Sequence, residues 1–212
     1  MAKISYKNNN NTLEYGAKIG WVFPLEYPLK NYIKIISQSK SSKSIDEFFT
    51  EYFHSDFERT IKTPIRQYYS DIPIHLKSLL EECFISYESD HYQICVPALF
   101  AILEGLLIEL SNGQDRAKTK YTQGILDKIQ TLGETPKILP LTSIVYFLEM
   151  TFCQRNFNEP ETGMINRHWS QHGRYITELS KKSPLQLFNA VALVLFAKNF
   201  INENTATLES NP

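Results

Sequence analysis

Apolar positions return every three or four residues along most of the chain, which is the spacing of an amphipathic helix. The first long stretch of this kind covers residues 45–65. Ser44 and Glu47 form a capping box at its start, so the helix is expected to begin at Ser44. Pro64 is expected to bend or end it, because proline cannot donate the backbone hydrogen bond that continues a helix.

The next two stretches predict neighbouring helices. Pro73 opens one of them, and Ser89-Asp90 ends it. The other covers residues 94–110 and is apolar nearly all round, with Glu104 and Glu109 as its only charged residues. A helix without a polar face belongs in the middle of a bundle.

The second half of the chain predicts three more helices. Residues 115–132 form a more polar stretch, whereas residues 139–153 are strongly apolar. The last helix, 183–201, starts at the capping box Ser183-Pro184-Leu185-Gln186. The sequence lacks the alternation and hairpin turns of strands, so we predict an all-α bundle of five to six helices with a short N-terminal extension.

The boundaries of this bundle follow from composition. Residues 1–44 are predicted to be an N-terminal extension and linker, in which the asparagine run at 8–11 is irregular and residues 32–37 form a short helix or strand. Residues 45–201 form the helical domain. Residues 202–212 form a frayed C-terminal tail.

Charge and hydropathy narrow the possible partners. The chain of 212 residues has 22 basic and 23 acidic side chains, so it has no global attraction for nucleic acid or anionic membrane. Any such binding requires a local basic patch. The first residues lack the apolar core of a secretory signal, and the apolar run 183–197 is shorter than the roughly 18–20 residues of a membrane span. We therefore expect a cytoplasmic protein that does not bind a membrane.

The cysteines do not indicate a metal site. Cys83, Cys95 and Cys153 are odd in number, widely spaced and free of any C-x-x-C pair. Each lies in an apolar stretch, which is typical of reduced core cysteines in a cytosolic protein.

The densest group of chemically useful side chains is the nonapeptide NRHWSQHGR, which begins at Asn166. Asparagine is a good helix N-cap, and the free N–H groups of a first turn favour an anion such as phosphate. Arg167 could hold a phosphate through two hydrogen bonds. His172 could exchange a proton, because imidazole ordinarily titrates near neutral pH. These groups suffice to cleave RNA without a metal, by attack of the ribose 2′-OH on the adjacent phosphorus.

The spacing of these residues limits how one chain could use them. On an ideal helix Arg167 and His172 lie about 140° apart around the axis, so they do not share a face. A loop at Arg167, or a second copy of the site across a dimer, would bring the two groups together. His168 and His172 do share a face, because they are four positions apart.

The motif resembles the R-x(4–6)-H signature of the HEPN superfamily, with Arg167 and His172 at its ends and the polar His168 after the arginine. The string NRHWSQHG is similar to the NRH-x-x-x-HG form of bacterial defence-related members. The apolar stretch that carries Glu104 and Gly105 also resembles the upstream helix of those members. In that family the signature precedes the last long helix of an α-bundle, as it does here.

The resemblance implies a metal-independent endoribonuclease that needs no cofactor and acts as a toxin or antiviral defence effector. It implies a homodimer in which two motifs face each other, with RNA as substrate and an antitoxin or sensor as a possible further partner. Arg167 and His172 would be the catalytic pair, His168 the polar residue at the second motif position, and Glu104 the supporting acid.

Further residues of the segment are candidates for RNA binding. Asn166 lies at the expected phosphate site, and Trp169 either packs in the core or stacks on an unpaired base. Arg174, Lys181 and Lys182 form either a basic patch for backbone phosphates or an ordinary solvated helix face.

Several alternatives stay open. His168 and His172 have the spacing of metal ligands in H-E-x-x-H enzymes, but no glutamate lies between them, so we predict no metal site. Glu104 either reaches water or pairs with Arg167 or a histidine, since an ionised carboxylate in an apolar helix needs a partner. The whole domain could also be a non-catalytic HEPN-like module that binds RNA, a nucleotide or a protein, or a structural helical adaptor.

Overall fold

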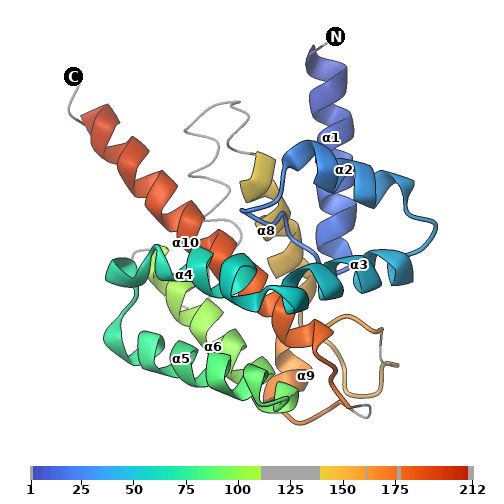
Figure 1. Ribbon diagram of the computed structural model, residues 1–212, viewed down its shortest axis with the longest axis vertical. Coiled ribbons are helices and arrows are strands. Elements are labelled where there is room, and N and C mark those ends of the chain that lie inside the picture. Colours follow the sequence, from blue (N-terminus) through green and yellow to red (C-terminus); the bar gives the residue numbers. More distant parts are fainter. Residues whose placement is uncertain (1, 111–138, 161, 176–177, 210–212) are drawn as a thin grey trace.

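The structure is a computed structural model. It describes residues 2–110, 139–160, 162–175 and 178–209. These residues form helices and loops and contain no strand, which confirms the all-α prediction (Figure 1). The helix expected at 115–132 lies outside the described residues.

The described helical elements follow one another along the chain as α1 (Ala2–Lys18), α2 (Leu29–Gln38), α3 (Ser42–Ser55), the π-helical turn η1 (Glu58–Lys62), α4 (Thr63–Arg66), the 3₁₀ turn η2 (Tyr69–Asp71), α5 (Ile74–Glu88), α6 (Tyr92–Leu110), α8 (Leu139–Thr151), α9 (Arg167–Gln171) and α10 (Lys182–Glu209). Predicted helices coincide with α5, α6 and α8 to within two residues.

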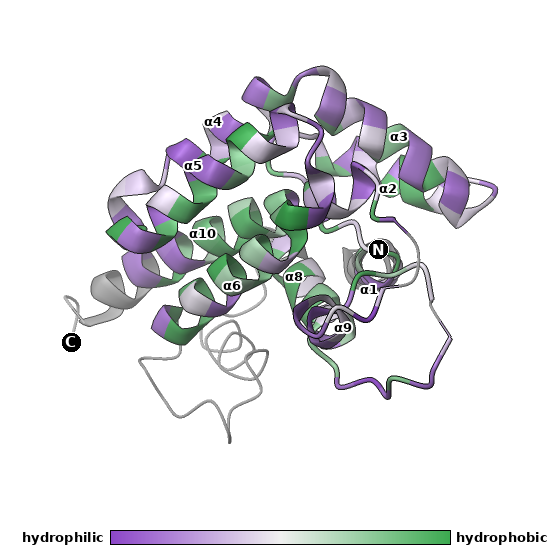
Figure 2. Ribbon diagram, turned by 90° about the horizontal axis from the view of Figure 1, so that it is seen from below, coloured by the Kyte–Doolittle hydropathy of each residue, from purple (hydrophilic) through white to green (hydrophobic). Residues whose placement is uncertain are grey.

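Helix α10 is the central element of the fold. It crosses the molecule and packs against α3, α4, α6 and α8 (Figure 1). Helix α1 lies along α8, α5 lies along α6, and the short α9 reaches α6. Apolar residues are concentrated on α6, α8 and α10 in the middle, while polar residues mark the outer faces of α3 and α5 (Figure 2). The prediction that residues 94–110 lie in the interior of the bundle is therefore confirmed for one side of α6 only.

Side-chain hydrogen bonds join α10 to the loop after α1. Gln186 Nε2 donates to the carbonyl of Ile19 at 3.3 Å, and Asn189 Nδ2 donates to the carbonyl of Val22 at 2.8 Å. Gly20 lies in this loop with φ +102°, and a Cβ there would come within 2.1 Å of Gln186 Nε2. Only glycine therefore fits the loop so close to α10.

Two predicted helix starts are wrong. The N-cap of α3 is Ser41, whose hydroxyl accepts from the N–H of Ser44, so the helix begins before the expected capping box. Helix α10 begins at Lys182, one residue before Ser183, and the side chain of Gln186 is used for the contact with the α1 loop.

The predicted helix 45–65 is interrupted. Helix α3 ends at Ser55, and Asp56 has non-helical dihedral angles of φ −143° and ψ 62°. The chain resumes as the π-helical turn, in which the N–H of Thr63 donates to the carbonyl of Glu58. Pro64 lies in the first turn of α4, where proline causes no loss, so it does not end the helix.

The N-terminal segment is more regular than predicted. The asparagine run at 8–11 lies within α1, where Asn10 Oδ1 accepts from the hydroxyl of Thr142 at 3.1 Å. Leu13 and Trp21 are fully buried in the same core as α10. Packing along α8 thus outweighs the low helix propensity of the run. The tail expected from residue 202 is also helical, because α10 continues to residue 209.

Two helices are long and apolar enough to span a membrane, namely Tyr92–Leu110 and Lys182–Glu203. The second corrects the expectation that the last apolar stretch is too short. Half of the apolar window in the first helix and 78% of that in the second are buried inside the protein. Core helices of soluble proteins meet the same criteria, so the cytoplasmic location stays a prediction.

All three cysteines are free. Cys83 and Cys95 are buried, as predicted, whereas Cys153 is half-buried. Burial raises the pKa of Cys83 to about 12 and that of Cys95 to about 11, so both thiols stay protonated at neutral pH.

Candidate functional site

Asn166 sets the start of α9, as the sequence predicted for an N-cap. Its Oδ1 accepts from the N–H of Trp169 at 3.2 Å, and its Nδ2 donates to the carbonyls of Thr151 and Cys153 at 3.3 and 2.9 Å. The side chain is 1% exposed. It therefore ties α9 to the end of α8 and has no surface for RNA, which corrects its expected binding role.

Gly173 ends α9 after a single turn and a half. The N–H of Arg174 donates to the carbonyl of Trp169 at 2.9 Å, and the N–H of Gly173 donates to that of Ser170 at 3.4 Å. This is a Schellman cap, and the φ of +62° at Gly173 explains the glycine of the motif. With five residues, α9 is too short to provide the phosphate site expected at its start.

Arg167 is paired with Glu104, which is one of the alternatives that the sequence left open for this carboxylate. Its Nη2 and Nε donate to Glu104 Oε2 at 2.7 and 3.2 Å. The glutamate side chain is 16% exposed and the arginine 30%, and the contact joins residues 63 positions apart. The ion pair joins α9 to α6 through Nε and Nη2 of the guanidinium, while 30% of the arginine side chain remains exposed.

The two histidines of the motif lie four positions apart, in α9 and at its C-cap. His172 is the C-cap residue and is exposed, and His168 is half-buried. Their ring centres are 4.7 Å apart. Among the described residues no contact joins Arg167 to His172, in agreement with the angle expected on a helix. One chain therefore presents these two groups in different directions.

Phe157, from the loop before α9, completes an aromatic group with the histidines. Its ring stacks on that of His168 at 5.0 Å with an interplanar angle of 8°, and it lies 5.7 Å from the ring of His172. Arg174 Nε donates to the carbonyl of Phe157 at 2.5 Å. The sequence pattern did not indicate a role for this residue, although it is the only aromatic side chain of the polar stretch 154–163.

Trp169 packs in the interior, which is one of the two alternatives that the sequence left open, and its burial excludes the other, a base-stacking role. It is 1% exposed and contacts the ring of Tyr175. The guanidinium groups of Arg155 and Arg174 lie 6.0 and 5.7 Å from its ring centre. These cation–π contacts help to hold the segment that surrounds α9.

The predicted basic patch is largely committed to protein groups. Lys182 pairs with Asp46 of α3 at 3.0 Å, and the other oxygen of Asp46 accepts from Trp21 Nε1 at 2.8 Å. Arg174 is held by the loop carbonyl and by the Trp169 ring. Lys181 is half-buried and forms no ion pair within the described part of the chain. This correction leaves Arg167 and the histidines as the accessible groups of the segment.

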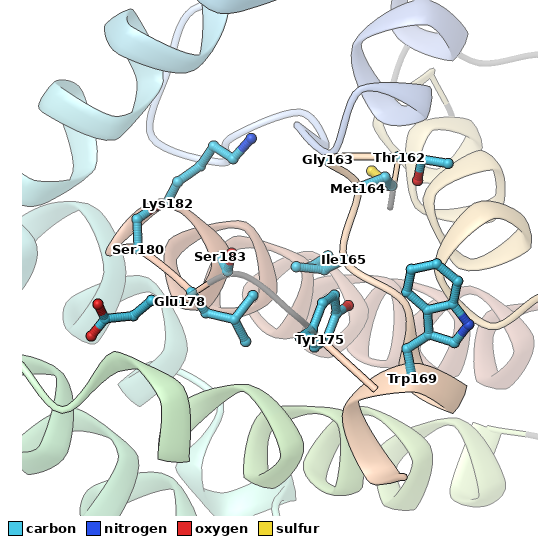
Figure 3. Close-up of a pocket in the computed structure, with 11 residues that line it drawn as sticks. Thr162, Gly163, Met164, Ile165, Trp169, Tyr175, Glu178, Ser180, Lys182 and Ser183 are labelled. Carbon is cyan, nitrogen blue, oxygen red and sulfur yellow. The ribbon is translucent and has the colours of Figure 1, made fainter. Parts of the chain in front are cut away.

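A cavity of about 150 Å³ lies between the motif and the start of α10, with Tyr175, Ile165 and Ser183 around its middle (Figure 3). The hydroxyl of Tyr175 accepts from the N–H of Asn166 at 2.5 Å and donates to its carbonyl at 3.2 Å. Pockets for small molecules usually exceed about 300 Å³, so this cavity is too small to hold a nucleotide. No group of three potential metal ligands occurs among the described residues.

Fold and site together define an all-α protein in which one short helix carries an arginine–glutamate pair and a histidine cluster. No protein-family model, no curated protein and no solved structure matches this chain. The similarity to the HEPN superfamily therefore rests on the residues quoted above and stays a prediction.

Proposed function

We propose that this protein is a metal-independent endoribonuclease of the HEPN type, acting as a toxin or antiviral defence effector. The observation that carries the proposal is the Arg167–Glu104 ion pair, because it holds Nε and Nη2 of the guanidinium while 30% of the arginine side chain stays exposed and can meet a phosphate. His172 supplies the second required group, an exposed imidazole. In the proposed reaction the ribose 2′-OH attacks the phosphorus, giving a 2′,3′-cyclic phosphate and a free 5′-OH.

The roles of the residues follow from their chemistry. His172 transfers the proton, as a general base or acid, and Arg167 stabilises the charge on the phosphoryl oxygens. His168 packs against His172 and orients it. Glu104 acts through Arg167 as a positioning residue. Because Arg167 and His172 of one chain face different directions, a complete site needs two protomers, which is the basis of the proposed homodimer.

The test is cleavage of total RNA in EDTA by the wild type, Arg167→Ala and His172→Ala. Each substitution is expected to lower the rate by about a hundredfold or more, because proton transfer and charge stabilisation each contribute at least that much. His75→Ala and Arg59→Ala are matched controls, since His75 is an exposed histidine of α5 and Arg59 pairs with Asp56 at 2.6 Å. His172→Ala cutting RNA like the wild type would remove the basis of the proposal.

The dimer has its own test. Mixing Arg167→Ala with His172→Ala is expected to restore part of the activity, because a mixed dimer contains one intact pair of groups across the interface. Mixtures that stay inactive, although light scattering shows exchange of subunits, would argue against a composite site.

A second candidate is a module that binds RNA without cutting it. It is favoured by the fact that Glu104 already balances the charge of Arg167. Binding of RNA by the wild type with no cleavage of any tested substrate would select this function.

A further inference from the structure

Phe157 is an exposed aromatic side chain that the core does not explain. It is 44% exposed and comes from the loop between α8 and α9. Single exposed apolar residues are common on protein surfaces, so exposure alone carries no argument. The contacts that hold this ring beside the motif histidines are what distinguish it.

The ring of Phe157 is fixed in place by the motif. One of its faces is stacked nearly parallel on His168, and the edge contact is made with His172. The backbone of the same residue is held by Arg174, just after the glycine cap. Within the described part of the chain no further ring contacts Phe157, and 44% of the residue is exposed to solvent. The protein thus presents a preorganised flat apolar surface next to the proposed catalytic imidazole.

We propose that Phe157 is the platform on which one unpaired base of the RNA substrate stacks. The inference rests on the proposed function and names its substrate class, which is RNA that is single-stranded at the point of cleavage. Every nucleobase has a face that can stack on an aromatic ring. In a duplex those faces are covered by neighbouring base pairs, so only an unpaired base can occupy the platform.

The position of the ring suits this role. A base stacked on Phe157 places its own sugar and phosphate beside His172, whose ring centre is 5.7 Å away. The guanidinium groups of Arg155 and Arg174 lie near the same segment, 6.0 and 5.7 Å from the ring centre of the buried Trp169. They add positive charge where the nucleic acid backbone would run. Trp169 itself cannot take this role, because it is enclosed in the interior.

The experiment uses a 2′-O-methyl oligouridine that contains one 2-aminopurine. Its blocked 2′-oxygen cannot attack the phosphorus, so binding is measured without cleavage. The wild type is expected to bind the single strand and to change the 2-aminopurine emission, and to lose this binding when the probe is annealed to its complement. Phe157→Leu is expected to bind about tenfold more weakly and without the emission change, whereas Phe157→Trp retains both.

Phe48→Leu is the matched control, because Phe48 is a similarly exposed phenylalanine on α3. Wild-type affinity and emission in Phe157→Leu would overturn the platform, as would failure of the wild type to bind the probe. A wild type that binds with the emission change but does not cut the unmodified oligonucleotide would keep the platform and reject the nuclease. If the wild type cuts the unmodified oligonucleotide but Phe157→Leu binds the probe as the wild type does, the nuclease is kept and the platform is rejected.

Discussion

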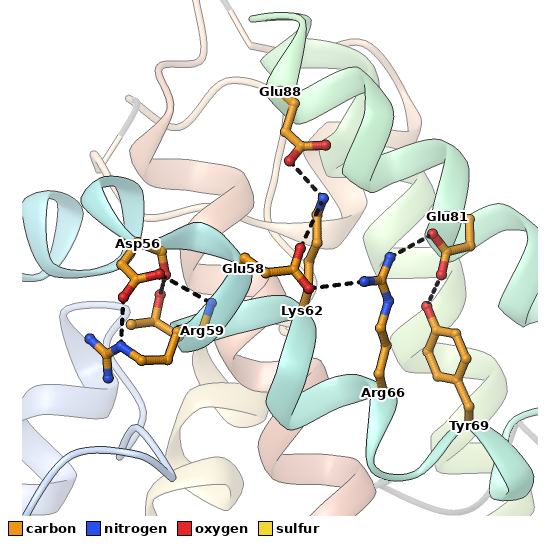
Figure 4. A network of polar contacts seen from close by, with 9 residues as sticks. Asp56, Glu58, Arg59, Lys62, Arg66, Tyr69, Glu81 and Glu88 are labelled. Atoms are coloured by element: carbon orange, nitrogen blue, oxygen red, sulfur yellow. Dashed lines mark hydrogen bonds and ion pairs between the residues drawn. The ribbon is translucent and has the colours of Figure 1, made fainter.

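Two regions of the molecule hold their charges in different ways. On the outer surface of α4 and α5, Lys62 reaches Glu58 and Glu88 at 3.4 and 2.6 Å, and Arg66 reaches Glu58 and Glu81 at 3.0 and 3.2 Å (Figure 4). Each cation thus has two carboxylate partners. Such a network is tolerant, because removing one member leaves the others paired.

The described residues around α9 show no such shared pairing. Arg167 donates two hydrogen bonds to a single oxygen of Glu104, and the side chain of Asn166 joins the start of α9 to the carbonyls of Thr151 and Cys153 at the end of α8. The difference indicates that the α4–α5 surface is built for solubility and general stability. The α9 region depends on individual side chains, as expected where geometry must be exact for chemistry.

The largest effect is expected when the single connection of α9 is removed. Asn166→Ala removes the side chain that caps α9 at the N–H of Trp169, and it leaves the carbonyls of Thr151 and Cys153 without their donor. We expect the free energy of unfolding to fall by about 3 kcal/mol. Ser41→Ala removes a cap of α3 that is exposed to solvent and should cost about 1 kcal/mol. Urea unfolding measures both. Equal losses would show that the α9 region is no more sensitive than an ordinary helix start.

A smaller effect is expected at the ion pair. Glu104→Ala leaves the half-buried guanidinium of Arg167 without its carboxylate, at a cost of about 2 kcal/mol. Arg66→Ala in the network should cost about 0.5 kcal/mol, because its partners are exposed and remain paired with Lys62 or hydrated. A double-mutant cycle of Glu104→Ala with Arg167→Ala isolates the coupling. A coupling energy near zero would show that this ion pair stabilises the protein no more than an exposed surface contact does.

The smallest effect is expected in how the stability of the protein changes at acidic pH. The hydrogen bond from Arg59 lowers the pKa of Asp56 below its ordinary value of 3.8. A lowered pKa in the folded state stabilises the protein above the unfolded value, and this stabilisation disappears as the pH falls below about 4. The denaturation midpoint of the wild type should therefore fall slightly more between pH 5 and pH 2 than that of Asp56→Asn. Identical pH dependence in the two proteins would show that Asp56 does not contribute to the loss of stability in acid.

The pKa of Glu81, another carboxylate in a charged pair on this surface, is lowered as well. Burial alone would raise its pKa, but hydrogen bonds from Tyr69 and Arg66 outweigh burial and lower it. Burial and the same contact with Glu81 raise the pKa of Tyr69 to about 12. The phenol therefore stays a hydrogen-bond donor across the physiological range.

Elements with strong apolar periodicity were predictable from the sequence. Helices α5, α6 and α8 agree with their patterns, because long apolar stretches must be buried whatever their partners are. The asparagine run of α1 and the break at Asp56 were not predictable. The first depends on packing against α8, and the second on a local conformation that the apolar spacing does not record.

The site was predictable only in part. The pairing of Glu104 with Arg167 followed from the cost of an isolated carboxylate in an apolar helix, and the N-cap role of Asn166 followed from its residue type. The burial of Trp169 and the stacking of Phe157 depend on how the loop between α8 and α9 folds back. That path is set by single hydrogen bonds such as the one from Arg174, which leave no periodic signal.

The contacts between α10 and the loop after α1 also have a consequence for synthesis of the protein. Asn189 and Gln186 bind carbonyls 167 residues earlier in the chain, so the core cannot close until α10 has left the ribosome. Until then Trp21 and the apolar faces of α1 and α3 lack their cover, which is a period when chaperones are expected to bind.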